Sequence, residues 1–353
     1  MSALGKQARD ASALSETVEW IRQVQHADGM IPWFSGGHAD PWNHVEAAMA
    51  LTVGGAVSAA RRAYEWLRST QRPDGSWHTY YLNGAEVEDA RLDTNVSAYV
   101  ATGVWHQFLA TEDLGFLEHM WPCVERAVGF VLSWQRPGGE LAWSVEPDGT
   151  PGSYALLAGS SSAYFSLRCA TACAGALGLE RPEWELGAGR LRHAIAHSTE
   201  GFADKDEFAM DWYYPVLAGA LDDKAASDRI EERWSEFVIT GRGVRCVSDH
   251  PWVTAAETAE CSMALVSIGR RDQAEALLDW AEQHRWPDGS YTTGIVYPQL
   301  ATFPQGERST YTAAAMVLAF DAVFSISPAA RLFTGESLPS GFELDSEVEA
   351  TPS

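Results

Sequence analysis

Residues 62–77 read RAYEWLRSTQRPDGSW, and the rest of this 353-residue chain repeats the pattern that they begin. They predict an amphipathic helix whose apolar side carries Trp66 and Leu67 and which ends at Gln71. The Pro-Asp-Gly run that follows cannot continue a helix and supplies a turn. The chain then enters a second helix at 96–105, where small and apolar residues cover nearly every face. The two helices and their turn form one helical hairpin.

Six such hairpins can be traced along the chain. The first helix of each pair carries charges on one side, which is typical of an outer layer. The second is rich in Ala, Ser, Thr and Gly, which favours a tightly packed inner layer. The predicted pairs are 16–25 with 42–53, 62–71 with 96–105, 116–135 with 160–177, 184–196 with 210–221, 225–238 with 254–268, and 272–285 with 308–324.

Stacked hairpins bury their apolar faces only against neighbours, and six of them can close into a ring. We therefore predict an all-α fold, a single (α/α)6 toroid with its inner helices around a lumen; an open solenoid is the alternative. The toroid is expected over residues 16–327. A flexible N-terminus at 1–15 and a disordered Ser/Pro/Glu-rich tail at 328–353 would flank it.

Composition limits the possible partners and compartments. No run approaches the roughly 20 apolar residues of a membrane span, and the N-terminus lacks the layout of a secretory signal. Five cysteines at irregular spacing favour reduced thiols and a cytoplasmic location. A net charge of −23 argues against nucleic acid or an anionic membrane as a partner. A small-molecule substrate is the remaining expectation.

The turn after the first helix recurs, completely at 71–77 and partially at 25–33, 135–143 and 285–291. With the helix before it, the complete copy resembles the glutamine–tryptophan repeat of triterpene cyclases and protein prenyltransferase β-subunits. For Gln71 and Trp77 themselves, a structural role in closing the turn is the favoured interpretation.

A second resemblance competes with the first. The segment ATGVWHQFL at 101–109, together with the helix that continues to residue 131, resembles the second hairpin of six-hairpin glycosidases. The Pro-Asp-Gly at 147–149, leading into the Ser-rich helix at 159–178, resembles the same family. Both families are α/α toroids, and both place their chemistry where the inner helices begin.

The starts of the inner helices are therefore the predicted site. Capping explains an Asp or Thr at a helix start, and it is the favoured interpretation for Asp93 or Thr254 taken alone. It does not explain acids one turn inside a small-residue helix, because a lone buried carboxylate is costly. The candidate catalytic residues are Asp93, Asp211, Glu257 and Glu46. The candidate substrate-binding residues are Trp42, His44, Asn95, Tyr99, Trp212, Tyr213, Tyr214, Trp252, Arg308 and Tyr311.

Acids beside aromatic rings suit two chemistries. In isoprenoid cyclisation a protonated acid donates its proton to an alkene, and aromatic faces stabilise the carbocations that result. In glycoside hydrolysis one acid protonates the leaving oxygen while a second carboxylate activates water or attacks. The leading hypothesis is an isoprenoid-handling enzyme, on the complete repeat at 62–77. The alternative is a glycan-acting hydrolase or lyase, and the third is a non-catalytic binding toroid.

Metal-binding signatures are weak. Cyclases of this fold carry Asp-x-Asp-Asp, whereas residues 92–95 read LDTN and keep one carboxylate. No Asp-Asp-x-x-Asp string for diphosphate-bound magnesium occurs, so no cofactor is evident and Mg²⁺ is not expected. A loop is a better explanation than a zinc site for Cys246, Asp249 and His250. Burial as thiols is the favoured interpretation of Cys169 and Cys173.

Overall fold

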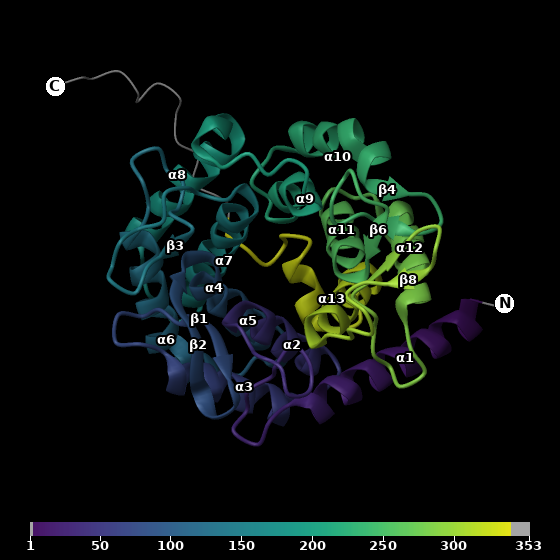
Figure 1. The fold of residues 1–353 in the computed structure, drawn as a ribbon. Coiled ribbons are helices and arrows are strands. Elements are labelled where there is room, and N and C mark those ends of the chain that lie inside the picture. The colour runs from purple at the N-terminus through teal and green to yellow at the C-terminus, as the bar shows by residue number, and fades with distance from the viewer. Residues whose placement is uncertain (1–2, 340–353) are drawn as a thin grey trace.

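The computed structural model describes residues 3–339, with side chains from residue 14 onward except that of residue 199. Its helices form two concentric layers (Figure 1). The inner layer contains α2 (Pro41–Val53), α4 (Thr94–Ala98) continued by α5 (Val100–Thr111), α7 (Leu157–Ala176), α9 (Ala209–Leu217), α11 (Ala255–Ser267) and α13 (Thr310–Phe324). The outer layer contains α1 (Ala3–Val24), α3 (Val57–Thr70), α6 (Leu114–Ser133), α8 (Pro182–His197), α10 (Asp223–Phe237) and α12 (Arg271–Ala281).

The inner helices close a ring. Each contacts the next in chain order, and α13 packs against both α11 and α2 (Figure 1). The predicted all-α toroid of six hairpins is thus confirmed, and the open solenoid is excluded. The layers differ as their sequences predict: α3 buries Tyr64 and Leu67 and exposes Arg61 and Arg68, whereas α13 is buried almost all round.

Short antiparallel strands, which the sequence analysis did not predict, join several outer helices to inner ones. One sheet contains β1 (His78–Leu82), β2 (Glu86–Asp93) and β3 (Ser144–Val145); the others pair β4 (Val238–Ile239) with β5 (Gly243–Val244), and β6 (Trp252–Thr254) with β7 (Gly294–Val296) and β8 (Ala301–Thr302). Strand β2 ends on Asp93, which pairs with Ser144, and β6 ends on Thr254, which pairs with Gly294. The sheets therefore fix where α4 and α11 begin.

Three glutamines hold neighbouring outer helices together at what we call the glutamine turns. The Gln71 amide donates to the carbonyl oxygens of Gly75, 3.0 Å away, and Cys123 of α6, 2.9 Å away. Gln25 makes the equivalent pair of bonds to its own turn and to α3, and Gln135 does so to its own turn and to α8. The indole of Trp77 donates to the Leu67 carbonyl. The structural interpretation of Gln71 and Trp77 is confirmed.

The glycines of these turns lie directly on the next outer helix. Gly75 has φ +94°, and a Cβ at this position would lie 2.1 Å from the Arg126 carbonyl oxygen. The turn at 286–289 packs in the same way on Glu16 of α1, to which Arg285 also donates a hydrogen bond. This contact joins the turn after the last outer helix, α12, to the first outer helix, α1.

Both predicted chain boundaries need correction. Helix α1 begins at Ala3 rather than Glu16, so the backbone of residues 3–15 is helical. At the other end, the 3-10 helix Pro328–Leu332 buries Leu332, and the buried Phe333 ring stacks on Phe165. Apolar side chains in an otherwise polar stretch explain why the packed fold extends past residue 327. Residues 340–353, the rest of the expected tail, lie outside the described residues.

No helix within residues 3–339 combines the length and apolar character needed to cross a bilayer. All five cysteines are free thiols, and Cys169 and Cys173 are buried as predicted. The cytoplasmic location stays a prediction.

Candidate active site

The six inner-helix starts gather at one end of the ring. Backbone bonds join neighbouring starts: Thr310 of α13 donates to the Trp33 carbonyl just before α2, and Ala158 of α7 donates to the Asp211 carboxylate of α9, 3.0 Å away. We call this end the N-terminal face of the inner ring, comprising residues 40–46, 93–99, 157–162, 209–214, 254–260 and 308–311.

Two aspartates cap adjacent helices on this face. Asp93 caps α4 by accepting a hydrogen bond from the Val96 amide, 2.9 Å away. Asp40 caps α2, and its carboxylate also accepts from the Trp33 indole and the Asn43 side chain, each at 2.6 Å. Capping of Asp93 is confirmed, whereas the Thr254 side chain makes no capping bond.

These caps are unusual in being buried, with 4% of Asp40 and 6% of Asp93 exposed. Burial raises the pKa of Asp93 to about 7, and the nearby charge of Asp40 adds to the shift. Burial likewise raises the pKa of Asp40. A carboxyl group that holds its proton near neutral pH can serve as a general acid.

Deeper in the ring, Glu46 of α2 and Glu260 of α11 form a buried acidic pair. The Tyr99 hydroxyl donates to Glu46, 3.3 Å away, and the Tyr213 hydroxyl donates to Glu260. Burial, followed by the charge of Glu260, raises the pKa of Glu46 well above its usual range. Burial also raises the pKa of Glu260 to about 8. The pair is therefore mainly protonated at neutral pH.

Glu257 lies one helical turn before Glu260 and is only half-buried, so water reaches it more easily than the deeper pair. Its charge contributes, after burial, to raising the pKa of Tyr311 and of the Cys246 thiol, which places both side chains near it. Asp211 stands elsewhere on the face, and burial raises its pKa to about 6. The four predicted catalytic acids therefore all lie at the N-terminal face.

Aromatic rings surround these acids. Trp42 packs on Tyr99 and Tyr214 with ring centroids 5.1 and 6.4 Å apart. Trp33 lies edge-on to Tyr311, 5.1 Å between centroids. Beside them, the buried side-chain oxygen of Asn95 has no hydrogen-bond partner among the described residues. The arrangement joins flat apolar faces to groups that can donate or accept protons.

Three predicted substrate-binding residues do not face the lumen. His44 Nδ1 accepts from the Ile31 amide while its Nε2–H donates to the Ala63 carbonyl, so the imidazole joins α2 to α3. Burial lowers its pKa to about 4, which keeps it neutral. Trp212 turns outward and stacks on Phe237 of α10.

Arg308 is the third of these corrections. Its guanidinium pairs with Asp288, 2.7 Å away, and lies over the Trp286 ring, so it braces the 286–289 turn rather than reaching a lumen acid. Trp252 stays close to the face on β6, half-exposed, with its indole donating to the Phe303 carbonyl.

The sequence analysis missed Asp40, Glu260 and Trp33 as site residues. Glu257 and Glu260 stand three apart on a small-residue helix, and this spacing puts both on one helix face. Asp40 precedes a proline at a helix start. This pattern predicts a helix cap and gives no sign of a further role. No sequence signal places Trp33, because it reaches Asp40 through a loop.

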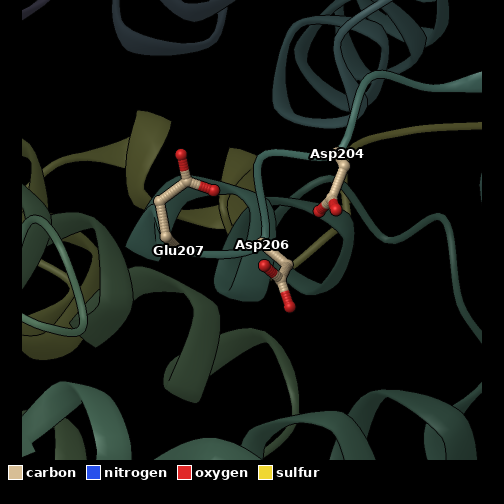
Figure 2. A group of neighbouring side chains, drawn as sticks. All are labelled: Asp204, Asp206 and Glu207. Carbon is tan, nitrogen blue, oxygen red and sulfur yellow. The ribbon is translucent and has the colours of Figure 1, made fainter.

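One acidic cluster could hold a cation. Figure 2 shows Asp204, Asp206 and Glu207 on the loop that leads into α9, with side-chain oxygens within 4.8 Å of one another. Asp204 and Asp206 are exposed, and such groups are common without an ion. The Cys246, Asp249 and His250 segment is a loop, in which His250 pairs with Asp249 and Cys246 lies near Glu257.

Comparison with known proteins shows which class of toroid this is. A wild-type glycosidase superposes with a TM-score of 0.74 at 15% identity, over 93% of this chain and 100% of its own. A GH63 mannosylglycerate hydrolase from Thermus thermophilus superposes with a TM-score of 0.68 at 13% identity, over 89% and 100%. A D-mannose isomerase superposes with 0.67 at 11%, over 92% and 99%. These likenesses show that the chain shares its α/α-toroid fold with these proteins.

The family follows from a much nearer relative. The MMP endo-(1,4)-3-O-methyl-alpha-D-mannosidase of Mycolicibacterium hassiacum is 52% identical over 330 residues, which cover 93% of this chain and 90% of that protein. The chain belongs to the family of this mannosidase and is a glycoside hydrolase. No protein-family model matches the sequence. The glycan-acting alternative is thus supported, and the isoprenoid hypothesis, which rested on the repeat at 62–77, is not.

Proposed function

We propose that this glycosidase cleaves α-(1,4)-linked 3-O-methylmannose chains at internal linkages. The observation that carries the proposal is the 52% identity to a mannosidase of that specificity over nearly the whole of both chains. A lumen face lined with protonatable acids and aromatic rings agrees with it, because aromatic faces stack on sugar rings.

We propose Asp93 as the general acid and Glu257 as the second carboxylate. The contacts order the inner helices as α2, α4–α5, α7, α9, α11 and α13, so α4 and α11 stand opposite each other in the ring. A glycosidic oxygen bound between them would have one acid on either side, as hydrolysis requires.

The environments of the acids support this division of roles. Asp93, with a pKa of about 7, holds a proton that it can give to the leaving oxygen. Asp40 has both carboxyl oxygens engaged by the Trp33 indole and by Asn43, so neither is free to present a proton to the substrate. The half-buried Glu257 can activate water or attack the sugar directly. Glu46 and Glu260 lie deeper, where they would orient Tyr99 and Tyr213.

The decisive experiment incubates the purified chain with 3-O-methylmannose oligosaccharides, with their unmethylated counterparts and with polyprenyl diphosphates, followed by mass spectrometry. We expect shorter methylated oligosaccharides from the first set and no change in the last. Glu257→Gln should lower kcat by about 10²- to 10⁴-fold. Glu232→Gln, an exposed glutamate on α10, is the matched control and should keep full activity.

Two outcomes would contradict parts of the proposal. Intact methylated oligosaccharides after prolonged incubation with the wild-type enzyme would exclude the substrate. Loss of activity in Asp40→Asn combined with full activity in Asp93→Asn would show that Asp93 is not the acid. The anomeric form of the first product, read by NMR, would then distinguish attack by Glu257 from attack by water.

A further inference from the structure

A groove of about 470 Å³ runs beside the N-terminal face, between the loop that contains Phe34 and the loop at 304–308. Trp20 and Val24 of α1 form its floor. This volume lies within the range of roughly 300–1,000 Å³ in which proteins hold small ligands. The groove could therefore accommodate part of an oligosaccharide.

The lining is mainly apolar. Trp20, Val24, Phe34 and Pro304 contribute carbon surface, and 36% of Phe34 is exposed. The charged groups at its edge already have protein partners, because Arg308 pairs with Asp288 and Glu307 accepts from the Thr293 hydroxyl. Ser35 and Gln305 also line the groove and could bond to the hydroxyls of any hexose. Only an O-methylated hexose would in addition bury methyl groups on the carbon surface.

The loops that line the groove also lead toward the acids. Trp33, the neighbour of Phe34 in the chain, donates its indole hydrogen to Asp40 and packs on Tyr311. At the opposite wall, the charge of Glu307 and that of Glu257 both act on Tyr311. Tyr311 thus lies near both the acid Glu257 and the loops that line the groove.

We propose that this groove binds the sugar residues adjacent to the cleaved linkage and selects for O-methyl groups through the Phe34 ring and its apolar neighbours. The inference rests on the proposed function, since an enzyme that cuts inside a chain must hold sugars on both sides of the bond. It adds to that function a defined place where methylation is recognised.

The test measures binding apart from hydrolysis. Isothermal titration uses the full chain and a thio-linked, non-hydrolysable tetrasaccharide of 3-O-methylmannose, alongside its unmethylated analogue. We expect Phe34→Ala to weaken binding of the methylated probe about tenfold and to change binding of the unmethylated one less than twofold. Phe324→Ala is the matched control: its ring is also 36% exposed, but it lies at the C-terminal end of α13, away from the groove.

The outcomes separate the two proposals. Equal affinity of the wild-type protein for both probes, or equal losses for both probes in Phe34→Ala, would overturn the inference even if the enzyme hydrolyses methylated chains. Tight, methyl-selective binding that depends on Phe34 would support it even if hydrolysis were found on a different linkage. Thermal unfolding of both variants, expected to match the wild type, checks that each has folded.

Discussion

The glutamine turns and the N-terminal face alternate along the chain, yet their polar groups are in opposite environments. At the turns, each glutamine amide has two carbonyl partners at 2.8–3.0 Å, repeated from one outer helix to the next. At the face, carboxyl groups are buried, and burial raises the pKa values of Asp93 and Glu260 to about 7 and 8 despite the hydrogen bonds that they accept.

The difference separates stability from function. A fully bonded amide stabilises the fold wherever the same turn recurs, and it can do so in families with unrelated chemistry. A buried, poorly compensated acid destabilises the fold at neutral pH, and its presence points to a chemical role. The following predictions test this contrast.

The largest expected effect compares two helix caps. Asp93 caps inner helix α4 and Asp222 caps outer helix α10, each by accepting one amide hydrogen. Because asparagine also caps well, neither Asp→Asn variant should lose more than about 1 kcal/mol of stability. In assays on the methylated substrate, Asp93→Asn should lower kcat about 10³-fold and Asp222→Asn should not change it. Equal activity in the two variants would mean that Asp93 only caps.

The second effect concerns close packing at a turn. Gly75→Ala forces a Cβ against the Arg126 carbonyl oxygen at a positive φ, and we expect a loss of about 3 kcal/mol or more in the free energy of unfolding. Gly55 has φ +75° with open space around its Cβ position, so Gly55→Ala should cost only about 1 kcal/mol. Urea unfolding measures both free energies. Similar losses in the two variants would show that the backbone at Gly75 shifts readily to accommodate a Cβ.

Removing a glutamine turn's side chain should have a smaller effect. Gln71→Ala leaves two carbonyl oxygens without their donor, which should cost about 2 kcal/mol. Gln23→Ala, which removes one exposed bond to Glu19, is the control and should be neutral. Activity below the unfolding temperature should be unchanged in both variants. A loss of kcat in Gln71→Ala alone would contradict the claim that this turn serves stability and not catalysis.

The last effect is the pH dependence of stability. The pKa of Asp93 is raised in the folded state, so its contribution is favourable below the unfolded value near 4 and is lost as the pH rises through about 7. Asp93→Asn should therefore gain stability relative to wild type between pH 5 and pH 8, by about 2–3 kcal/mol. Asp222→Asn should show a flat difference. A relative loss for Asp93→Asn over that interval would show that its carboxylate is stabilised rather than strained.

Much of the fold could be predicted because its signals are local. Charged and small-residue helices alternate, and the turn after Gln71 repeats, so hairpins, layers and closure follow. The chemistry could not be predicted from the same repeat, since Gln71 and Trp77 make bonds that any toroid can use. The clearest copy of the motif therefore favoured the wrong family, whereas the weaker likeness at 101–131 favoured the right class of enzyme.

The sequence also could not show which side of each inner helix faces the lumen. Trp212 and Tyr213 are neighbours on α9, yet the first packs outward on Phe237 and the second reaches Glu260 in the lumen. When a helix is buried on every side, its sequence carries no polar stripe that marks which side faces the centre. The predictions for His44 and Arg308 were wrong for the same reason. A polar residue near an inner-helix start can bond to the outer layer or to a turn as readily as it can face the lumen.

The closure of the ring, with α13 against α2 and the 286–289 turn on α1, has a consequence for how such an enzyme can change over time. Asp93 and Glu257 come from opposite halves of the chain, so exchanging one half between relatives would combine acids that were never selected together. The loop at 304–308 carries neither acid, and its tip can vary as long as Arg308 keeps its pair with Asp288. Substrate preference can therefore diverge through a surface loop, while the two proposed acids must be inherited as a pair.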